Sequence, residues 1–144
     1  MKAFTLLLII LVFVACNKDK ENVPTYTNDK FELTAAADWT LVNEQGIDTY
    51  VGYYQKEDYK IEFDFGYLAY GNIDSIKNTP DLLLFEELLI DGNKAKIVKE
   101  NRPDGTRLSA YIDKGDEVNK NRLYTFNTSN DQLFIDIVKS HKFK

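Results

Sequence analysis

Apolar and polar side chains alternate strictly in the middle of this 144-residue chain. From residue 59 to residue 67, large apolar side chains occupy every second position, and Lys60, Glu62, Asp64 and Gly66 lie between them. Successive side chains of a β-strand point to opposite faces, so the pattern predicts a strand with one buried and one solvated face. Half-buried strands of this kind are typical of antiparallel sheets.

Turn signals around this strand predict a sheet that is rich in hairpins. Residues 49–55 form the preceding strand pattern, which a short polar turn joins to the first. The dipeptide Asp91-Gly92 separates the strand patterns 87–90 and 94–98. Because both residues readily adopt positive φ, the dipeptide is the strongest short-range signal for a two-residue hairpin.

Three further strands complete the expected sheet. They are predicted at residues 31–35, 106–113 and 122–128. A turn at residues 102–105 precedes the second of them, with a proline that presets φ and a glycine that accepts a left-handed conformation.

Two segments are expected to be helical. Residues 78–85 hold a candidate helical turn, since Thr79 is followed by Pro80 at the first helical position. Near the C-terminus, Ser129 or Asn130 is a candidate N-cap for an amphipathic helix. Its apolar stripe would consist of Leu133, Phe134, Ile137, Val138 and His141. The same C-terminal segment also fits a strand with alternate apolar residues on one face.

These elements predict an α+β domain with a single antiparallel, hairpin-rich sheet and a C-terminal helix packed on one face. Trp39 is expected to pack under the sheet. The order of a short first strand, a tryptophan, hairpins, an Asp-Gly turn and a last helix resembles PsbP-like domains, in which an antiparallel sheet carries helices on its faces. That resemblance implies a fold and no function.

The N-terminus has the layout of an export signal. Lys2 precedes an apolar run that ends at Cys16, the only cysteine, and the run is too short to span a bilayer permanently. The motif FVAC at residues 13–16 resembles the lipobox of bacterial lipoproteins, although Phe13 stands where leucine is common. This resemblance implies that Cys16 becomes the first residue of the mature chain and carries acyl groups. The alternative is an ordinary secretory peptide cleaved near Ala15.

This interpretation divides the chain into three parts. Residues 1–15 are the expected lipoprotein signal peptide, residues 16–30 a polar, flexible tether, and residues 31–144 the α+β domain. The chain also resembles small exported proteins of the Bacteroidota without an assigned function. That resemblance is carried by Trp39 and by the segments 46–52, 61–67, 90–97 and 137–143. It supports the fold and implies no chemical role. The lipobox predicts a location in the bacterial cell envelope, on the outer membrane, on either its periplasmic or its surface side.

The charge of the chain limits its partners. A formal net charge of −5 argues against binding nucleic acid or anionic lipid head groups by charge. The expected partners are the membrane, through lipid on Cys16, and a protein or a glycan.

Few residues suit catalysis. His141 is the only histidine and lies near the chain end, so neither a multi-histidine metal site nor a usual Ser-His-Asp arrangement is expected. The acidic loop at residues 113–121 does not match the EF-hand spacing. We therefore expect no catalytic residues, no metal and no cofactor. The alternative is a small hydrolase that uses the carboxylate pair Glu62 and Asp64, or Ser109 with His141.

Tyrosine is the most suggestive feature outside the core. Six tyrosines lie between residues 50 and 70, namely Tyr50, Tyr53, Tyr54, Tyr59, Tyr67 and Tyr70. The neighbours Tyr53 and Tyr54 must point to opposite faces of a strand. Strand propensity accounts for part of the enrichment. Exposed tyrosines also favour interfaces and stacking on sugars, so these residues are the candidate binding patch of a non-catalytic binding or accessory protein.

Overall fold

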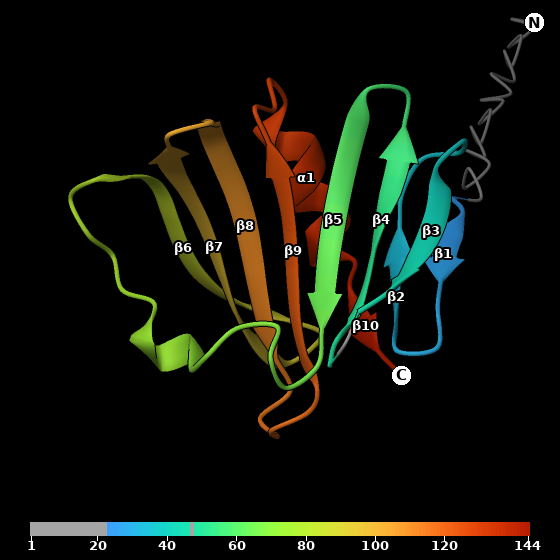
Figure 1. The fold of residues 1–144 in the computed structure, drawn as a ribbon, viewed down its shortest axis with the longest axis horizontal. Coiled ribbons are helices and arrows are strands. Elements are labelled where there is room, and N and C mark those ends of the chain that lie inside the picture. The colour runs from blue at the N-terminus through green and yellow to red at the C-terminus, as the bar shows by residue number, and fades with distance from the viewer. Residues whose placement is uncertain (1–22, 47) are drawn as a thin grey trace, which may run out of the picture.

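Two antiparallel sheets and one α-helix form the domain (Figure 1). The computed structural model describes residues 23–46 and 48–144. The larger sheet has seven strands in the order β3 (Thr40–Gln45), β4 (Tyr50–Lys56), β5 (Tyr59–Phe65), β9 (Lys120–Phe126), β8 (Gly105–Asp113), β7 (Asn93–Arg102) and β6 (Leu82–Ile90). The smaller sheet consists of β1 (Thr25–Thr27), β2 (Phe31–Thr34) and β10 (Lys142–Phe143). The helices are α1 (Asp131–Lys139) and the short 3₁₀ helix η1 (Ile73–Ser75).

The seven-stranded sheet is built from two meanders that meet at its centre. Strands β3–β4–β5 form one meander and β6–β7–β8–β9 the other. They are joined by the ladder between Glu62–Phe65 of β5 and Asn121–Tyr124 of β9. We call the face that carries α1 and the smaller sheet the inner face, and the opposite face the outer face (Figure 1). The alternation in β5 places Ile61, Phe63 and Phe65 on the inner face, where they are buried.

The expectation of an α+β domain with a C-terminal helix is confirmed, but the single sheet is wrong. The second sheet forms because β2 pairs with the short strands β1 and β10, the first and the last strand of the described residues. Strands of two or three residues are too short to show a period. Strand β3 was also not predicted, and it completes the edge beside β4.

Two local expectations need correction. Residues 78–85 hold no helical turn: β6 begins at Leu82, because pairing with β7 extends the hairpin through nine residues. The 3₁₀ turn lies earlier, at η1. Part of the expected tether is also ordered, since residues 25–27 form β1 and Asn28 is buried. The expected signal peptide and residues 16–22 lie outside the described residues.

The predicted Asp91-Gly92 hairpin is confirmed. Asp91 and Gly92 both have positive φ, 49° and 79°. These angles are those of a type I′ turn, whose twist matches that of the flanking strands. Ile90 and Asn93 pair directly beside the turn, which sets the register of the whole β6–β7 ladder.

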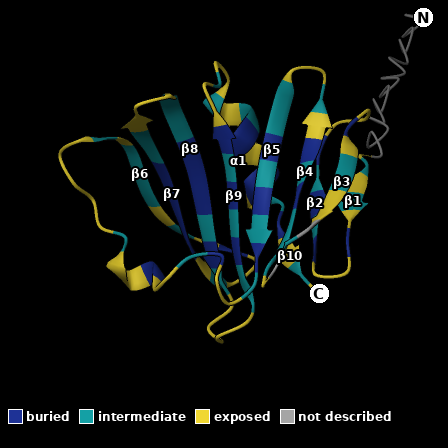
Figure 2. Cartoon of the chain, viewed as in Figure 1, coloured by how far each residue is buried: buried dark blue, intermediate teal, exposed yellow. Residues whose placement is uncertain are grey.

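Aromatic packing around Phe31 joins the two sheets. Phe31 of β2 is fully buried, and its ring centroid lies 5.2 Å from that of Phe63 and 6.0 Å from that of Phe65, both on β5. It also lies 6.3 Å from Tyr54 of β4 and 5.1 Å from His141. Figure 2 shows that the buried residues follow the central strands and the helix, whereas the loops are exposed.

The C-terminal segment is a helix rather than a strand. The Asn130 side chain accepts a hydrogen bond of 3.0 Å from the Leu133 N–H, which caps the first turn as expected. Phe134, Ile137 and Val138 are buried against the inner face. Lys99 of β7 forms an ion pair with Asp131 in the first helical turn. In the part of the chain that the structure describes, no helix is both long and apolar enough to cross a membrane.

His141 is a core residue. Its side chain is fully buried between the rings of Phe31 and Phe143, and its Nε2 lies 3.0 Å from the Asn121 Nδ2. The amide donates and the imidazole nitrogen accepts, so the ring is neutral. Burial lowers the pKa of His141 to about 3.

Replacing Phe31 with alanine should remove the packing that joins the sheets. We expect Phe31→Ala to lower the free energy of unfolding by about 3–5 kcal/mol, because a large buried aromatic leaves a cavity. The measurement is urea denaturation followed by circular dichroism. Phe126→Ala is the matched control: this side chain is 39% exposed, and its loss should cost less than about 1 kcal/mol. Equal losses would contradict the central position of Phe31.

The depressed pKa of His141 makes stability depend on pH. Below about pH 6.5 the unfolded chain binds a proton at this histidine and the folded chain does not, so stability falls as the pH falls toward 3. Denaturation at about pH 7.5 and about pH 4.5 should show about 2–3 kcal/mol more acid destabilisation in the wild type than in His141→Gln. The same pH dependence in both proteins would exclude His141 as its source.

Candidate binding surface

The six tyrosines of the predicted patch do not form one surface. Tyr50 and Tyr54 project from β4 onto the inner face, where both pack against Phe63. Tyr54 is only 2% exposed, and burial raises the pKa of both hydroxyls. Tyr54 therefore belongs to the core, whereas Tyr50 is only partly buried and also lines a hollow of about 570 Å³ at the end of the sheet.

Tyr53 and Tyr59 lie apart from each other. Tyr53 is on the outer face, and the Lys60 Nζ lies 4.1 Å from the centre of its ring. Tyr59 packs edge-on against Trp39, accepts a hydrogen bond from the Thr128 hydroxyl and donates one to the Asn130 carbonyl. Burial raises the pKa of Tyr59, so its hydroxyl remains a donor that fastens the start of β5 to the start of α1.

The two remaining tyrosines of the patch come together at one end of the sheet. They belong to a surface that we call the tip, formed by Tyr67, Leu68, Tyr70, Val118 and Lys120. Tyr67 is 59% exposed, Leu68 56% and Val118 59%. Tyr67, Leu68, Tyr70 and Lys120 line a hollow of about 370 Å³, and Tyr67 and Val118 share a neighbouring hollow of about 570 Å³.

Anchors on both sides force Tyr67 and Leu68 outward. Gly66 has a φ of 125°, which strains any residue with a Cβ, and its N–H donates to the Lys120 carbonyl at 2.9 Å. The Ala69 N–H then donates to the Gly66 carbonyl, and Ala69 is buried. The two residues between these fixed points are left in solvent.

Tyr70 fixes the far side of the same loop. Its hydroxyl donates to the Ile112 carbonyl at 2.7 Å, and its ring packs edge-on against Tyr111. Burial and the charge of Asp113 raise the pKa of Tyr70, so the hydroxyl stays protonated and keeps donating.

Val118 is held at the tip by a second loop, between β8 and β9. The Asp116 carboxylate accepts hydrogen bonds from the backbone N–H groups of Val118 and Asn119 and from the Asn119 side chain. These bonds lower the pKa of Asp116. Asn121 points away from this loop into the core, toward His141. Among residues 23–46 and 48–144, no group of three or more acidic, histidine or cysteine side chains is placed to hold a metal ion.

Lys120 gives the hollow a positive charge beside aromatic rings. Its Nζ lies 6.0 Å from the ring centres of both Tyr67 and Tyr70 and donates to the Gly71 carbonyl. A hollow of this kind suits a ligand that combines an apolar group with a carbonyl or carboxylate oxygen.

The carboxylates considered for catalysis are engaged on the outer face. Asp64 forms an ion pair with Arg122 at 3.0 Å, and Glu62 forms one with Lys60 at 3.2 Å. Ser109 lies on the outer face opposite Tyr124, whereas His141 lies on the inner face beside Asn121. The sheet therefore separates the serine and the histidine that a hydrolase would have to bring together.

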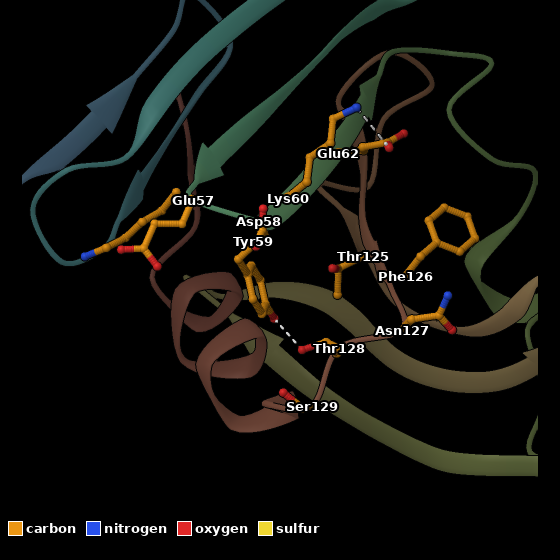
Figure 3. A pocket seen from close by; sticks show the side chains of 11 residues that line it. Glu57, Asp58, Tyr59, Lys60, Glu62, Thr125, Phe126, Asn127, Thr128 and Ser129 are labelled. Atoms are coloured by element: carbon orange, nitrogen blue, oxygen red, sulfur yellow. Dashed lines mark hydrogen bonds and ion pairs between the residues drawn. The ribbon is translucent and has the colours of Figure 1, made fainter.

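A shallow cleft lies at the other end of the sheet, where β5 and β9 separate (Figure 3). Its volume is about 450 Å³. It exists because the β5–β9 ladder covers only Glu62–Phe65, so Tyr59 and Lys60 face Thr125 and Phe126 without pairing. Figure 3 shows Tyr59 directed at Thr128 across it. Sequence reasoning missed this cleft, because the extent of a ladder between distant strands leaves no local signal.

No protein-family model matches the chain, and no curated protein matches its sequence. The resemblances to Bacteroidota lipoproteins and to PsbP-like domains stay predictions from the sequence. Cys16, the expected lipid attachment site, lies outside the described residues.

The contribution of the Tyr70 hydroxyl to the tip can be measured by removing that hydroxyl alone. Tyr70→Phe should lower the free energy of unfolding by about 1 kcal/mol, because the Ile112 carbonyl loses a partner. Urea denaturation of this variant and of the control Tyr67→Phe gives the comparison. The Tyr67 ring is 59% exposed, so the control should change stability by less than about 0.5 kcal/mol. No loss in Tyr70→Phe would mean that its hydrogen bond does not hold the loop.

Proposed function

We propose that this protein is a lipid-anchored lipoprotein of the bacterial cell envelope, on the outer membrane, that binds a partner through its tip and catalyses no reaction. The observation that carries the binding part is the tip itself, where three large apolar side chains are more than half exposed on two neighbouring loops. The anchoring part rests on the motif at residues 13–16 and on Cys16.

The chemistry of the tip favours a protein partner. Exposed apolar side chains that cluster beside charged residues are typical of interaction sites, and tyrosine is favoured at the centre of interfaces. Leu68 and Val118 offer aliphatic surface, which suits the side chains of a protein better than the hydroxyls of a sugar. A glycan stacked on Tyr67 is the alternative.

The chain enters the domain at the end of β5 that lies opposite the tip, which agrees with such a role. The Pro24 carbonyl accepts from the Ala35 N–H, and the Tyr26 hydroxyl accepts from the Trp39 N–H. Trp39 packs against Tyr59, the first residue of β5, whereas the tip follows the last residue of that strand. Seven residues of strand, about 23 Å, separate the two ends. A chain anchored at Cys16 would present the tip on the side away from its attachment.

Photo-cross-linking in living cells tests this proposal. A benzoylphenylalanine at position 67 should give a discrete cross-linked product, because the partner would lie against this ring. The matched control carries the same group at Asp104, an exposed turn residue between β7 and β8. It should give no product of the same mass.

The nature of the product separates the two classes of partner. Trypsin digestion of a protein adduct releases peptides of a second protein as well as those of this chain. Digestion of a glycan adduct releases peptides of this chain only. Absence of a product from position 67, or the same product from both positions, would contradict binding at the tip.

A further inference from the structure

Strand β6 is an open edge of the seven-stranded sheet (Figure 1). It pairs with β7 on one side, and no strand among the described residues pairs with it on the other. It is nine residues long, and every residue except Glu86 and Glu87 is apolar. The opposite edge, β3, has six residues, most of which are polar.

The hairpin geometry identifies the backbone groups that are free. In a two-residue turn the flanking pair, here Ile90 and Asn93, exchanges hydrogen bonds, and bonded and non-bonded pairs then alternate along the ladder. The N–H and C=O groups of Phe85, Glu87 and Leu89 therefore point away from β7. In the described part of the chain they have no hydrogen-bond partner.

The usual protections of a free edge are weak on β6. Native edges carry lysine, proline, a bulge or a charged residue that points inward, or are covered by a loop. Of these, β6 has one inward-pointing charge, Glu86, which pairs with Lys139 of α1. This strand has neither lysine nor proline, and its one irregularity lies at its start, between Leu82 and Leu84. Leu89, the last residue but one of the strand, is 69% exposed.

The charges of β6 indicate what would pair with it. Glu86 and Glu87 are neighbours, so they project to opposite faces. Glu86 forms an ion pair of 3.3 Å with Lys139 and Glu87 one of 2.7 Å with Lys96, and the two glutamate side chains are still 38% and 62% exposed. Pairing of the whole strand with a second copy would set Glu86 opposite Glu86 of that copy, which is destabilising. A strand with two adjacent basic residues would instead meet both carboxylates.

We propose that the free edge of β6 accepts an extended segment of a partner protein by strand addition, with basic residues opposite Glu86 and Glu87 and apolar residues on either side. This inference goes beyond the proposed function, since it concerns a different surface from the tip and does not depend on lipid attachment. The partner strand would supply hydrogen bonds to Phe85, Glu87 and Leu89 and cover the exposed leucine.

Amide hydrogen exchange, measured by NMR on the ¹⁵N-labelled full chain, tests the pairing at single residues. The probe is the acetylated and amidated peptide VTLKKLTV. In excess it should slow exchange at Phe85, Glu87 and Leu89 by about tenfold or more, while Glu86 and Leu88 are already slow without it. The matched peptide VTLEELTV should bind about tenfold more weakly.

Two variants separate strand addition from other binding. Glu87→Pro removes one outward N–H at a position where an edge tolerates proline, and it should abolish the protection. Leu89→Lys keeps the backbone and should weaken binding as well, so the test survives if the proline variant fails to fold. Unchanged exchange at the three amides would overturn the proposal. Protection that rises with protein concentration in the absence of peptide would also overturn it, because the occupant would then be a second copy.

Discussion

Burial of Phe31 is the packing constraint on which the rest of the structure depends. The ring contacts β4, β5 and His141, which directly precedes β10, and so ties the smaller sheet and the C-terminal segment to the seven-stranded sheet. With a single cysteine, the chain has no intramolecular disulfide to hold these parts together. The rings packed against the Phe31 side chain are aromatic, and His141 among them is kept neutral by burial. The domain therefore includes residues near its N-terminus that composition alone assigns to a tether.

A firmly packed sheet gives the tip its shape. Tyr67 and Leu68 protrude because Gly66 is fixed to β9, Tyr70 to β8 and Ala69 to Gly66, not because the loop lacks contacts. A preorganised apolar surface loses less conformational entropy on binding than a mobile loop. The outer face differs, because Asp64 and Arg122 pair there and their side chains are only 15% and 27% exposed. Binding is thus expected at the ends and the β6 edge of the sheet rather than over its outer face.

The sequence predicted what depends on neighbouring residues. The Asp91-Gly92 turn, the alternation of β5 and the Asn130 cap each need only a few adjacent positions, and all three are confirmed. The second sheet was missed because β2 and β10 are far apart in the sequence, and no local pattern predicts that two such short strands pair. The sequence predicted only part of the tip. Tyr67 and Tyr70 were in the predicted patch, whereas Val118 and Lys120 lie beside them only because β5 pairs with β9. Tyr54 was misplaced because tyrosine suits both a core and a surface.

Lipid anchoring at Cys16 is what would place the tip away from the membrane. The measurement is the intact mass of the mature protein from cell membranes, beside that of Cys16→Ala. We expect a wild-type chain that begins at Cys16, carries acyl groups and partitions with membranes, and a variant that is neither acylated nor membrane-bound. A soluble wild-type protein with an unmodified or absent Cys16 would contradict lipid anchoring.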